Sequence, residues 1–168
     1  GQTGSSYKSP DFSNLKPIQL EIVQESGPLG ARFVHPTSEG VEIEMVDGHG
    51  MIIVGWDHME QFQINKPMTE SLNIALAQQD PALKVEQLKS EVVPLFPLAS
   101  IKPGSNNIHL LIDAYLKAII QAERWEEGYE ASQITALNRS PASTVLYFYT
   151  IAENLFVTGK QEKGLKLL

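Results

Sequence analysis

The feature that most constrains this chain is a helical pattern that recurs within its last third. Over residues 108–122, apolar residues fall along one stripe at helical spacing, and polar residues lie off that stripe. A second helix is predicted from Trp125, and another pair of helices follows over 142–168. Gly128 and Gly164 stand at matching places in the second helix of each pair and are 36 residues apart. A helix-hairpin period in the mid-thirties indicates stacked helical repeats.

The second of these hairpins resembles a tetratricopeptide repeat. That family's set of large apolar, apolar, small and large apolar residues is matched by Phe148, Ile151, Ala152 and Leu155. Gly159 stands at the turn glycine and Gly164 at the small position of the second helix. The first hairpin is a poorer match, because Leu116 stands where a small residue is expected and Glu123 stands where the turn glycine is expected. The resemblance implies a stacked array that binds a protein or peptide. An ordinary antiparallel helical bundle is the alternative interpretation.

Six helices are predicted in a helical repeat domain that spans residues 67–168. Their expected ranges are 69–79, 81–93, 107–122, 125–137, 142–158 and 161–168. Asp80 and Pro81 mark the start of the second helix, because Asp is a common N-cap and Pro fits the first helical position. Pro94 and Pro97 then predict a connection without regular structure before the third helix. The first helix pair would supply the N-terminal layer of the stack.

Residues 17–66 have a different pattern and predict a small β domain. Strands are expected over 19–23, 30–35, 40–46 and 51–56, with turns at 37–40 and 47–50. Apolar and acidic residues alternate strictly over 40–46, which predicts one buried and one solvated face. The continuous apolar run over 51–56 predicts the most buried strand. We therefore expect an α+β protein, with an antiparallel β meander or SH3-like barrel in front of the helices.

This β pattern also resembles a small SH3-like domain of bacterial envelope and secreted proteins. The segments that carry the resemblance are Ala31–Val34, Ser38–Gly40, Val41–Val46, Asp47–Gly48 and Met51–Trp56. The resemblance implies a periplasmic or otherwise extracytoplasmic setting, with the cytoplasm as the open alternative. Residues 1–16 are rich in Gly, Ser and Thr and predict a flexible leader. They lack the charged and apolar segments of a signal peptide.

The composition of the 168-residue chain argues against several classes of function. The net charge is −7, and Lys and Arg do not cluster, so a nucleic-acid partner is not expected. Cys is absent, which excludes disulfides and thiolate chemistry. No apolar run is long enough for a transmembrane segment, and no glycine-rich phosphate loop is present. We expect no cofactor.

The predicted function is non-catalytic binding of a protein or peptide. In a tetratricopeptide-like stack, the first helix of each pair lines the inner groove. The residues off the apolar stripe that could face this groove are Asp113, Lys117, Tyr149 and Glu153. Their mixed charge predicts no particular ligand. The apolar chain end at Leu165, Leu167 and Leu168 also allows self-association through the C-terminal helices.

Two alternatives belong to other classes of function. Asp57, His58 and Glu60 lie within four residues, so a hydrolytic or metal-dependent enzyme could have its site at the junction of the two parts. The sequence holds no second His cluster that would complete a metal site, and solvated polar groups after a strand are the simpler interpretation. The second alternative is a structural component that docks on an assembly or cell-wall polymer. An exposed apolar patch would favour it.

Overall fold

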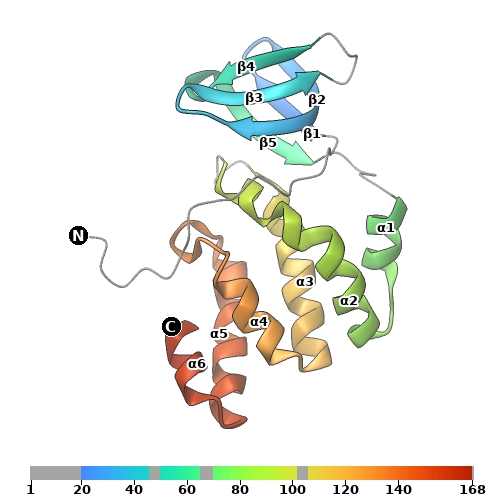
Figure 1. Cartoon of the computed structure of the whole chain (residues 1–168), viewed down its shortest axis with the longest axis vertical. Coiled ribbons are helices and arrows are strands. Elements are labelled where there is room, and N and C mark those ends of the chain that lie inside the picture. Colours follow the sequence, from blue (N-terminus) through green and yellow to red (C-terminus); the bar gives the residue numbers. More distant parts are fainter. Residues whose placement is uncertain (1–19, 46–49, 65–69, 102–105, 168) are drawn as a thin grey trace, which may run out of the picture.

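The computed structural model describes residues 20–45, 50–64, 70–101 and 106–167. The strands come first along the chain and form one sheet, and six α-helices follow (Figure 1). This arrangement confirms the α+β class and the antiparallel meander in front of a helical region. The leader predicted over 1–16 and the turn residues 47–49 lie outside the described residues.

Within the described residues the sheet has five strands, all joined by antiparallel pairing. They are β1 (Leu20–Gln24), β2 (Gly27–Pro36), β3 (Gly40–Met45), β4 (Met51–Gly55) and β5 (Met59–Ile64). The order across the sheet is β4-β3-β2-β1-β5, so β1 pairs with both β2 and β5. A short 3₁₀ turn, η1 (Trp56–His58), connects the last two strands. The described strands leave β4 and β5 as edges of an open sheet.

The turn between β2 and β3 forms where Thr37 and Gly40 predict it. The Thr37 hydroxyl accepts hydrogen bonds from the amides of Glu39 and Gly40 at 3.2 and 3.1 Å. The Thr37 amide donates to the Gly40 carbonyl at 2.7 Å. Gly40 has no room for a side chain, because a Cβ atom would lie 2.1 Å from the carbonyl oxygen of Val54. The hydrogen bonds of the Thr37 side chain and the close approach of Gly40 to β4 therefore hold this turn in place.

Strand β4 is not the most buried strand, which corrects the prediction for 51–56. Val54 is buried, whereas Met51, Ile52 and Ile53 are all exposed. The reason is the strand's position at the edge of the sheet, where it has one neighbour, β3. A continuous apolar run fits a strand covered on both faces, but the same run can also occupy an edge.

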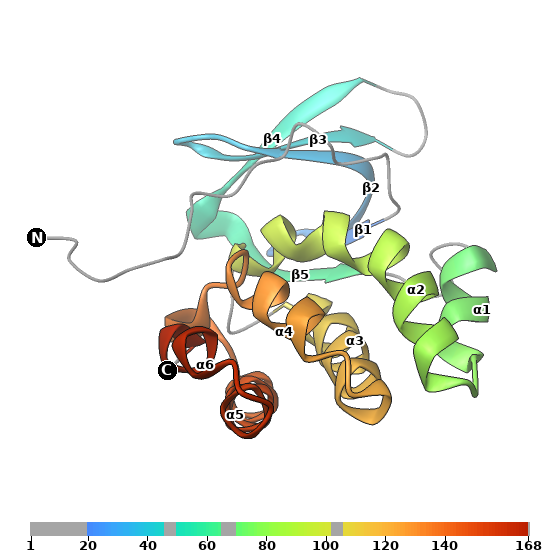
Figure 2. The ribbon, with the colours of Figure 1, turned by 60° about the horizontal axis from the view of Figure 1, so that its bottom comes forward.

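The described residues of the helical region form three helix pairs and two 3₁₀ segments. The α-helices are α1 (Glu70–Ala77), α2 (Pro81–Val92), α3 (Ile108–Ala122), α4 (Trp125–Ser132), α5 (Ala142–Val157) and α6 (Gln161–Leu167). α3 packs against α2 and α5, and α5 packs against α4 and α6. In Figure 2, α3 and α5 lie side by side farther from the sheet, whereas α2 and α4 lie nearer to it.

Helix α4 is shorter than predicted, since it ends at Ser132 and not near Leu137. The Ser132 hydroxyl donates to the Tyr129 carbonyl at 2.5 Å, and the Thr135 hydroxyl donates to the Ala131 carbonyl at 2.7 Å. Side chains that bond to nearby carbonyls compete with helical hydrogen bonding. A separate 3₁₀ turn then covers Leu137–Arg139. The predicted start of α4 at Trp125 is confirmed, but its predicted length is wrong.

The connection predicted after Pro94 is a 3₁₀ helix, η2 (Val93–Ser100), with four buried residues. Pro94 and Pro97 fix the backbone φ angle and lack an amide donor, which suits a short tight helix better than an α-helix. Asn106 joins η2 to α3. Its side-chain amide donates to the carbonyls of Leu98 and Ile101, and its side-chain oxygen accepts from the Ile108 amide at 2.8 Å.

The turns that end α3 and α5 have the same backbone hydrogen bonds. The Arg124 amide donates to the Ile119 carbonyl at 2.9 Å, and 36 residues later the Lys160 amide donates to the Leu155 carbonyl at 2.7 Å. The residue before each of these amides has a left-handed conformation. It is Glu123, with φ of 56°, in the first turn and Gly159, with φ of 85°, in the second.

Replacing Glu123 with glycine should therefore stabilise the protein. A non-glycine residue in the left-handed region costs about 1 kcal/mol, so we expect Glu123→Gly to raise the free energy of unfolding by roughly 0.5–1 kcal/mol. Gly159→Ala, the matched change in the opposite sense, should lower it by about 1 kcal/mol. Urea denaturation of both variants measures the two effects. A change of the same sign in the free energy of unfolding of both variants would contradict the equivalence of the two turns.

Candidate functional site

The predicted groove residues lie on the exposed sides of α3 and α5. Lys117, Tyr149 and Glu153 are exposed. Asp113 is half-buried, and its two carboxylate oxygens accept hydrogen bonds from Ser143 at 2.7 Å and Thr144 at 2.6 Å. Asp113 thus joins α3 to the first turn of α5, where a carboxylate also interacts favourably with the helix dipole. It has a structural contact, whereas the other three are accessible to a ligand.

Two leucines on the same side were missed at the sequence level. Leu110 on α3 and Leu146 on α5 are each 65% exposed, and they are separated by the same 36 residues as the two turns. Leu110 lies one turn before Asp113, and Leu146 lies one turn after Ser143. The contact between Asp113 and Ser143 joins the two helices that carry these leucines. The α3–α5 face is defined here as Leu110, Lys117, Leu146, Tyr149 and Glu153.

A groove lies beside this face, between the α1–α2 turn and α3. Its volume is about 580 Å³. The residues that line it are Leu76, Gln78, Gln79, Pro81, Lys84, Ala114, Lys117, Ala118 and Gln121. Lys84 extends from α2 and Lys117 from α3, so two helices bring two ammonium groups to one groove. Lys84 was not predicted as a site residue.

Most cations of the helical region are already paired with carboxylates. Arg124 pairs with Glu86 and Glu127, and Lys160 pairs with Glu126. Lys163 has a carboxylate partner at 2.6 Å, and Lys89 has two, at 3.8 and 3.9 Å. Lys166 also pairs with a carboxylate. Lys160 and Lys163 together lower the pKa of the Glu126 carboxyl by hydrogen bonding. Within the described residues, Lys84, Lys117 and Arg139 have no such partner.

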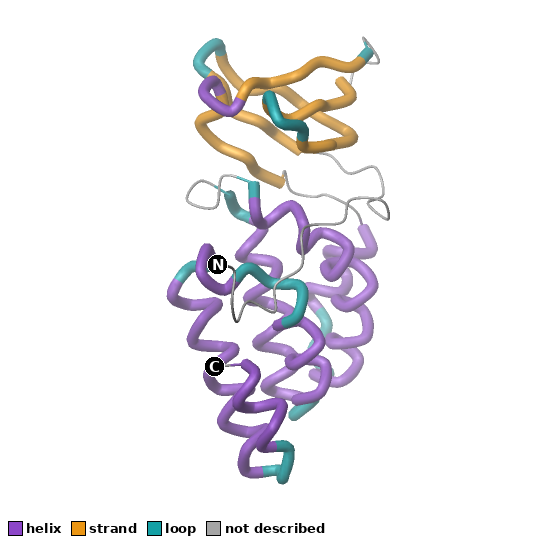
Figure 3. Tube along the Cα trace, turned by 60° about the vertical axis from the view of Figure 1, so that its left-hand side comes forward, coloured by secondary structure: helices purple, strands orange, loops and turns teal. Residues whose placement is uncertain are grey.

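The enzyme alternative placed its site at Asp57, His58 and Glu60. Asp57 and His58 lie in η1, which Figure 3 shows as a short helical turn among the strands, and Glu60 lies in β5. All three side chains are exposed. His58 Nδ1 lies 3.6 Å from Glu25 Oε1 at the β1–β2 turn. No group of three or more His, Asp and Glu able to hold a metal occurs in the described ranges.

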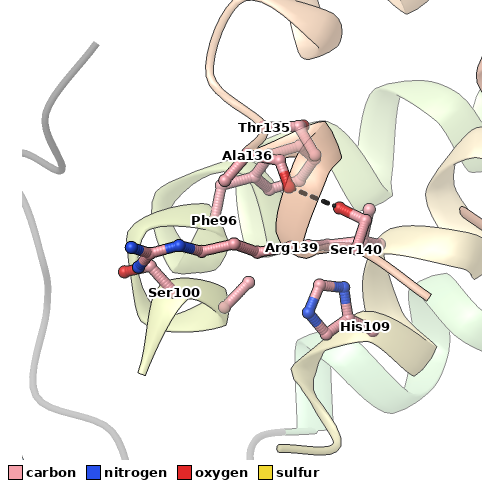
Figure 4. A pocket seen from close by; sticks show the side chains of 9 residues that line it. Phe96, Ser100, His109, Thr135, Ala136, Arg139 and Ser140 are labelled. Carbon is pink, nitrogen blue, oxygen red and sulfur yellow. Dashed lines mark hydrogen bonds between the residues drawn. The ribbon is translucent and has the colours of Figure 1, made fainter. Parts of the chain in front are cut away.

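A small pocket surrounds the buried His109 at the start of α3. The imidazole is 6% exposed, and neither ring nitrogen has a hydrogen-bond partner in the structure. Figure 4 shows the Arg139 side chain crossing the pocket toward Ser100, with the His109 ring below Ser140. The pocket volume of about 10 Å³ is enough for one water molecule. It is too small for a substrate.

Burial makes His109 a source of acid sensitivity. Burial lowers the pKa of His109, and the nearby Asp113 carboxylate and Ala99 carbonyl oppose this effect only in part. The unfolded chain therefore binds more protons than the folded chain as pH falls below about 6.5. The contribution of His109 to the free energy of unfolding should be fully present above that pH. It should decrease as the pH falls further, until the pH is below the pKa of His109 in the folded protein. Urea unfolding of wild type and His109→Leu between pH 8 and 5 should show a smaller pH slope in the variant.

Comparisons with protein-family models, with curated proteins and with solved structures found no match for this chain. The structure defines the class as an α+β protein, with an open antiparallel sheet followed by paired helices. In the part of the chain that the structure describes, none of these helices is both long and apolar enough to cross a membrane.

Proposed function

We propose that this chain is a non-catalytic interaction module that binds a protein or peptide segment across the α3–α5 face. The observation that carries the proposal is the pair of leucines, Leu110 and Leu146, each 65% exposed on neighbouring helices. Exposed leucines are common when scattered singly. Leu110 and Leu146 stand 36 residues apart on two helices that pack together, and the exposed Tyr149 lies one turn after Leu146. Exposed apolar side chains gathered on neighbouring helices favour binding of a partner.

The repeated turns support a tetratricopeptide-like arrangement of the helical region. The hydrogen bonds of the two turns recur at 36 residues, and Gly128 and Gly164 both lie against α5. Gly164 allows close approach within its own hairpin, and Gly128 allows close approach of α4 to the following hairpin. In such an arrangement α3 and α5 are the first helices of consecutive hairpins, and their exposed sides form one continuous binding surface.

The β region supports a bacterial envelope or secreted setting for this module. Its strand order, with a 3₁₀ turn between the last two strands, is compatible with the SH3-like resemblance, although the described sheet is open and not closed into a barrel. The resemblance of this region to envelope domains favours an extracytoplasmic location. The exposed apolar residues of β4 favour a second candidate role, in which the sheet docks on a larger assembly.

The test is selection of peptides on the intact protein from a randomised dodecapeptide library. Wild type should enrich a set of peptides that Leu110→Ser/Leu146→Ser does not bind. The matched control is Leu165→Ser on α6, because Leu165 is 63% exposed but lies outside the α3–α5 face. Equal thermal unfolding of the three proteins shows that folding is unchanged.

The outcomes separate the alternatives. Loss of binding in the double variant, with binding retained in Leu165→Ser, supports the α3–α5 face. Peptides that bind all three proteins equally would exclude this face as the binding site. Binding that disappears on Met51→Ser/Ile53→Ser, and on no helical variant, would move the site to β4.

A further inference from the structure

We propose that the bound segment is acidic and that Lys84 and Lys117 bind its carboxylates in the groove between α2 and α3. This inference rests on the proposed function, and it adds the charge of the partner and the groove that binds the charged side chains. The partner is a protein segment that combines Asp or Glu with apolar side chains.

The first step is the difference between these lysines and the other cations. In a chain with net charge −7, a lysine that can reach a carboxylate is expected to pair with one. Lys89, Lys160 and Lys163 do so. Lys84 and Lys117 line one groove together, and in the described part of the chain neither has a carboxylate partner. Their charges are therefore available to a ligand.

The second step concerns the acids nearest to the groove, which have other partners. The Asp80 carboxylate accepts from the Ala82 amide at 3.1 Å and caps α2. Asp113, one turn before Lys117, accepts from Ser143 and Thr144. The remaining polar side chains that line the groove are the amides of Gln78, Gln79 and Gln121. Asp80 and Asp113 keep their negative charge but do not line the groove, whose lining residues carry two positive charges and no negative one. This lining is the complement of an acidic ligand.

The third step is the distance between the groove and the apolar anchors. Lys117 lies seven residues after Leu110 on α3, which is two helical turns along the same side, or about 10 Å. An extended segment covers about 3.3 Å per residue. An acidic side chain roughly three residues from an apolar one can therefore reach Lys117 while its neighbour contacts Leu110. One short segment can use both features.

The experiment uses the same dodecapeptide library and adds two charge variants. Wild type should select peptides enriched in Asp and Glu, and Lys84→Gln/Lys117→Gln should lose this enrichment but keep the apolar preference. The control, Lys89→Gln/Lys166→Gln, changes the net charge equally and should select the same peptides as wild type. The most enriched wild-type peptide, resynthesised with Asn and Gln for its acids, should bind about fivefold more weakly in fluorescence anisotropy.

Each other outcome overturns one proposal. Peptides that depend on Leu110 and Leu146 but carry no excess of acids would overturn the acidic partner and leave the proposed function intact. Acidic peptides that bind Lys84→Gln/Lys117→Gln as well as wild type would overturn the role of the groove. Dimerisation in sedimentation velocity that the groove variant abolishes would replace the acidic partner with a second copy of this chain.

Discussion

Tyr115→Ala should lower the free energy of unfolding by about 3–5 kcal/mol, the largest effect that we expect from one substitution. Tyr115 lies in the middle of α3 and is 1% exposed. Its ring meets the ring of Phe96 edge-on, with centroids 6.2 Å apart and planes at 80°. The substitution removes this contact between α3 and η2 and leaves a cavity. Urea denaturation measures the loss.

Tyr115→Phe is the control for this prediction, because it keeps the ring and removes the hydroxyl group. Burial raises the pKa of the Tyr115 hydroxyl, with a smaller contribution from the Glu127 carboxylate. The side chain therefore stays neutral at ordinary pH, and the ring provides most of the stability. We expect the phenylalanine variant to lie within about 1 kcal/mol of wild type. A larger loss in Tyr115→Phe than in Tyr115→Ala would show that the hydroxyl matters more than the ring.

Gly164→Ala should destabilise the protein by roughly 1–3 kcal/mol, although alanine is the better helix former by about 1 kcal/mol. A Cβ atom at Gly164 would lie 2.7 Å from Phe156 Cδ2 and 2.9 Å from the carbonyl oxygen of Ala152. The phenyl ring can turn aside, but the backbone carbonyl of α5 cannot. The substitution must therefore push α6 away from α5. Thermal and urea unfolding both report this loss.

Two further variants test the cause of that loss. Gly128→Ala should also destabilise, because its Cβ would lie 2.7 Å from Ile151 Cγ2 on α5, and Ile151 is fully buried. Combining Gly164→Ala with Phe156→Ala should not restore wild-type stability, since the Ala152 carbonyl still blocks the approach. A stabilised Gly164→Ala variant would instead mean that intrinsic helix propensity decides the sign.

The class of fold was predictable because local patterns agreed with the final structure. The alternation over 40–46 became β3, with Val41 and Ile43 buried between partly exposed acids. The apolar stripe over 108–122 became α3, and Asp80 with Pro81 set the start of α2. These features depend on neighbours in the sequence, which periodicity and capping rules describe well.

The wrong or missing predictions depended on tertiary position. The run over 51–56 looks like a buried strand, but burial depends on which strand occupies the edge. The end of α4 depends on hydroxyl groups that bond to carbonyls one turn away. The left-handed conformation of Glu123 is imposed by the turn, because glutamate does not favour it. No periodicity contains this information.

The candidate site was predictable in part for the same reason. Lys117, Tyr149 and Glu153 lie off the apolar stripe, and this pattern places them at the surface. Leu110 and Leu146 were missed because a leucine in a helix is normally assigned to the core, although the 36-residue spacing could have identified them. Lys84 joins Lys117 only through the packing of α2 on α3, which no local rule predicts.

The ion pairs at the two helix turns connect each hairpin to the one before it. Arg124, which follows α3, pairs with Glu86 on α2, and Lys160, which follows α5, pairs with Glu126 on α4. These pairs are partly exposed, so mobile ions screen them, whereas the packing of α3 against α2 and of α5 against α3 is insensitive to ionic strength. Concentrated salt should therefore remove the contribution of the ion pairs and leave the apolar contacts between hairpins in place. The melting temperature should then fall slightly, while unfolding remains a single step.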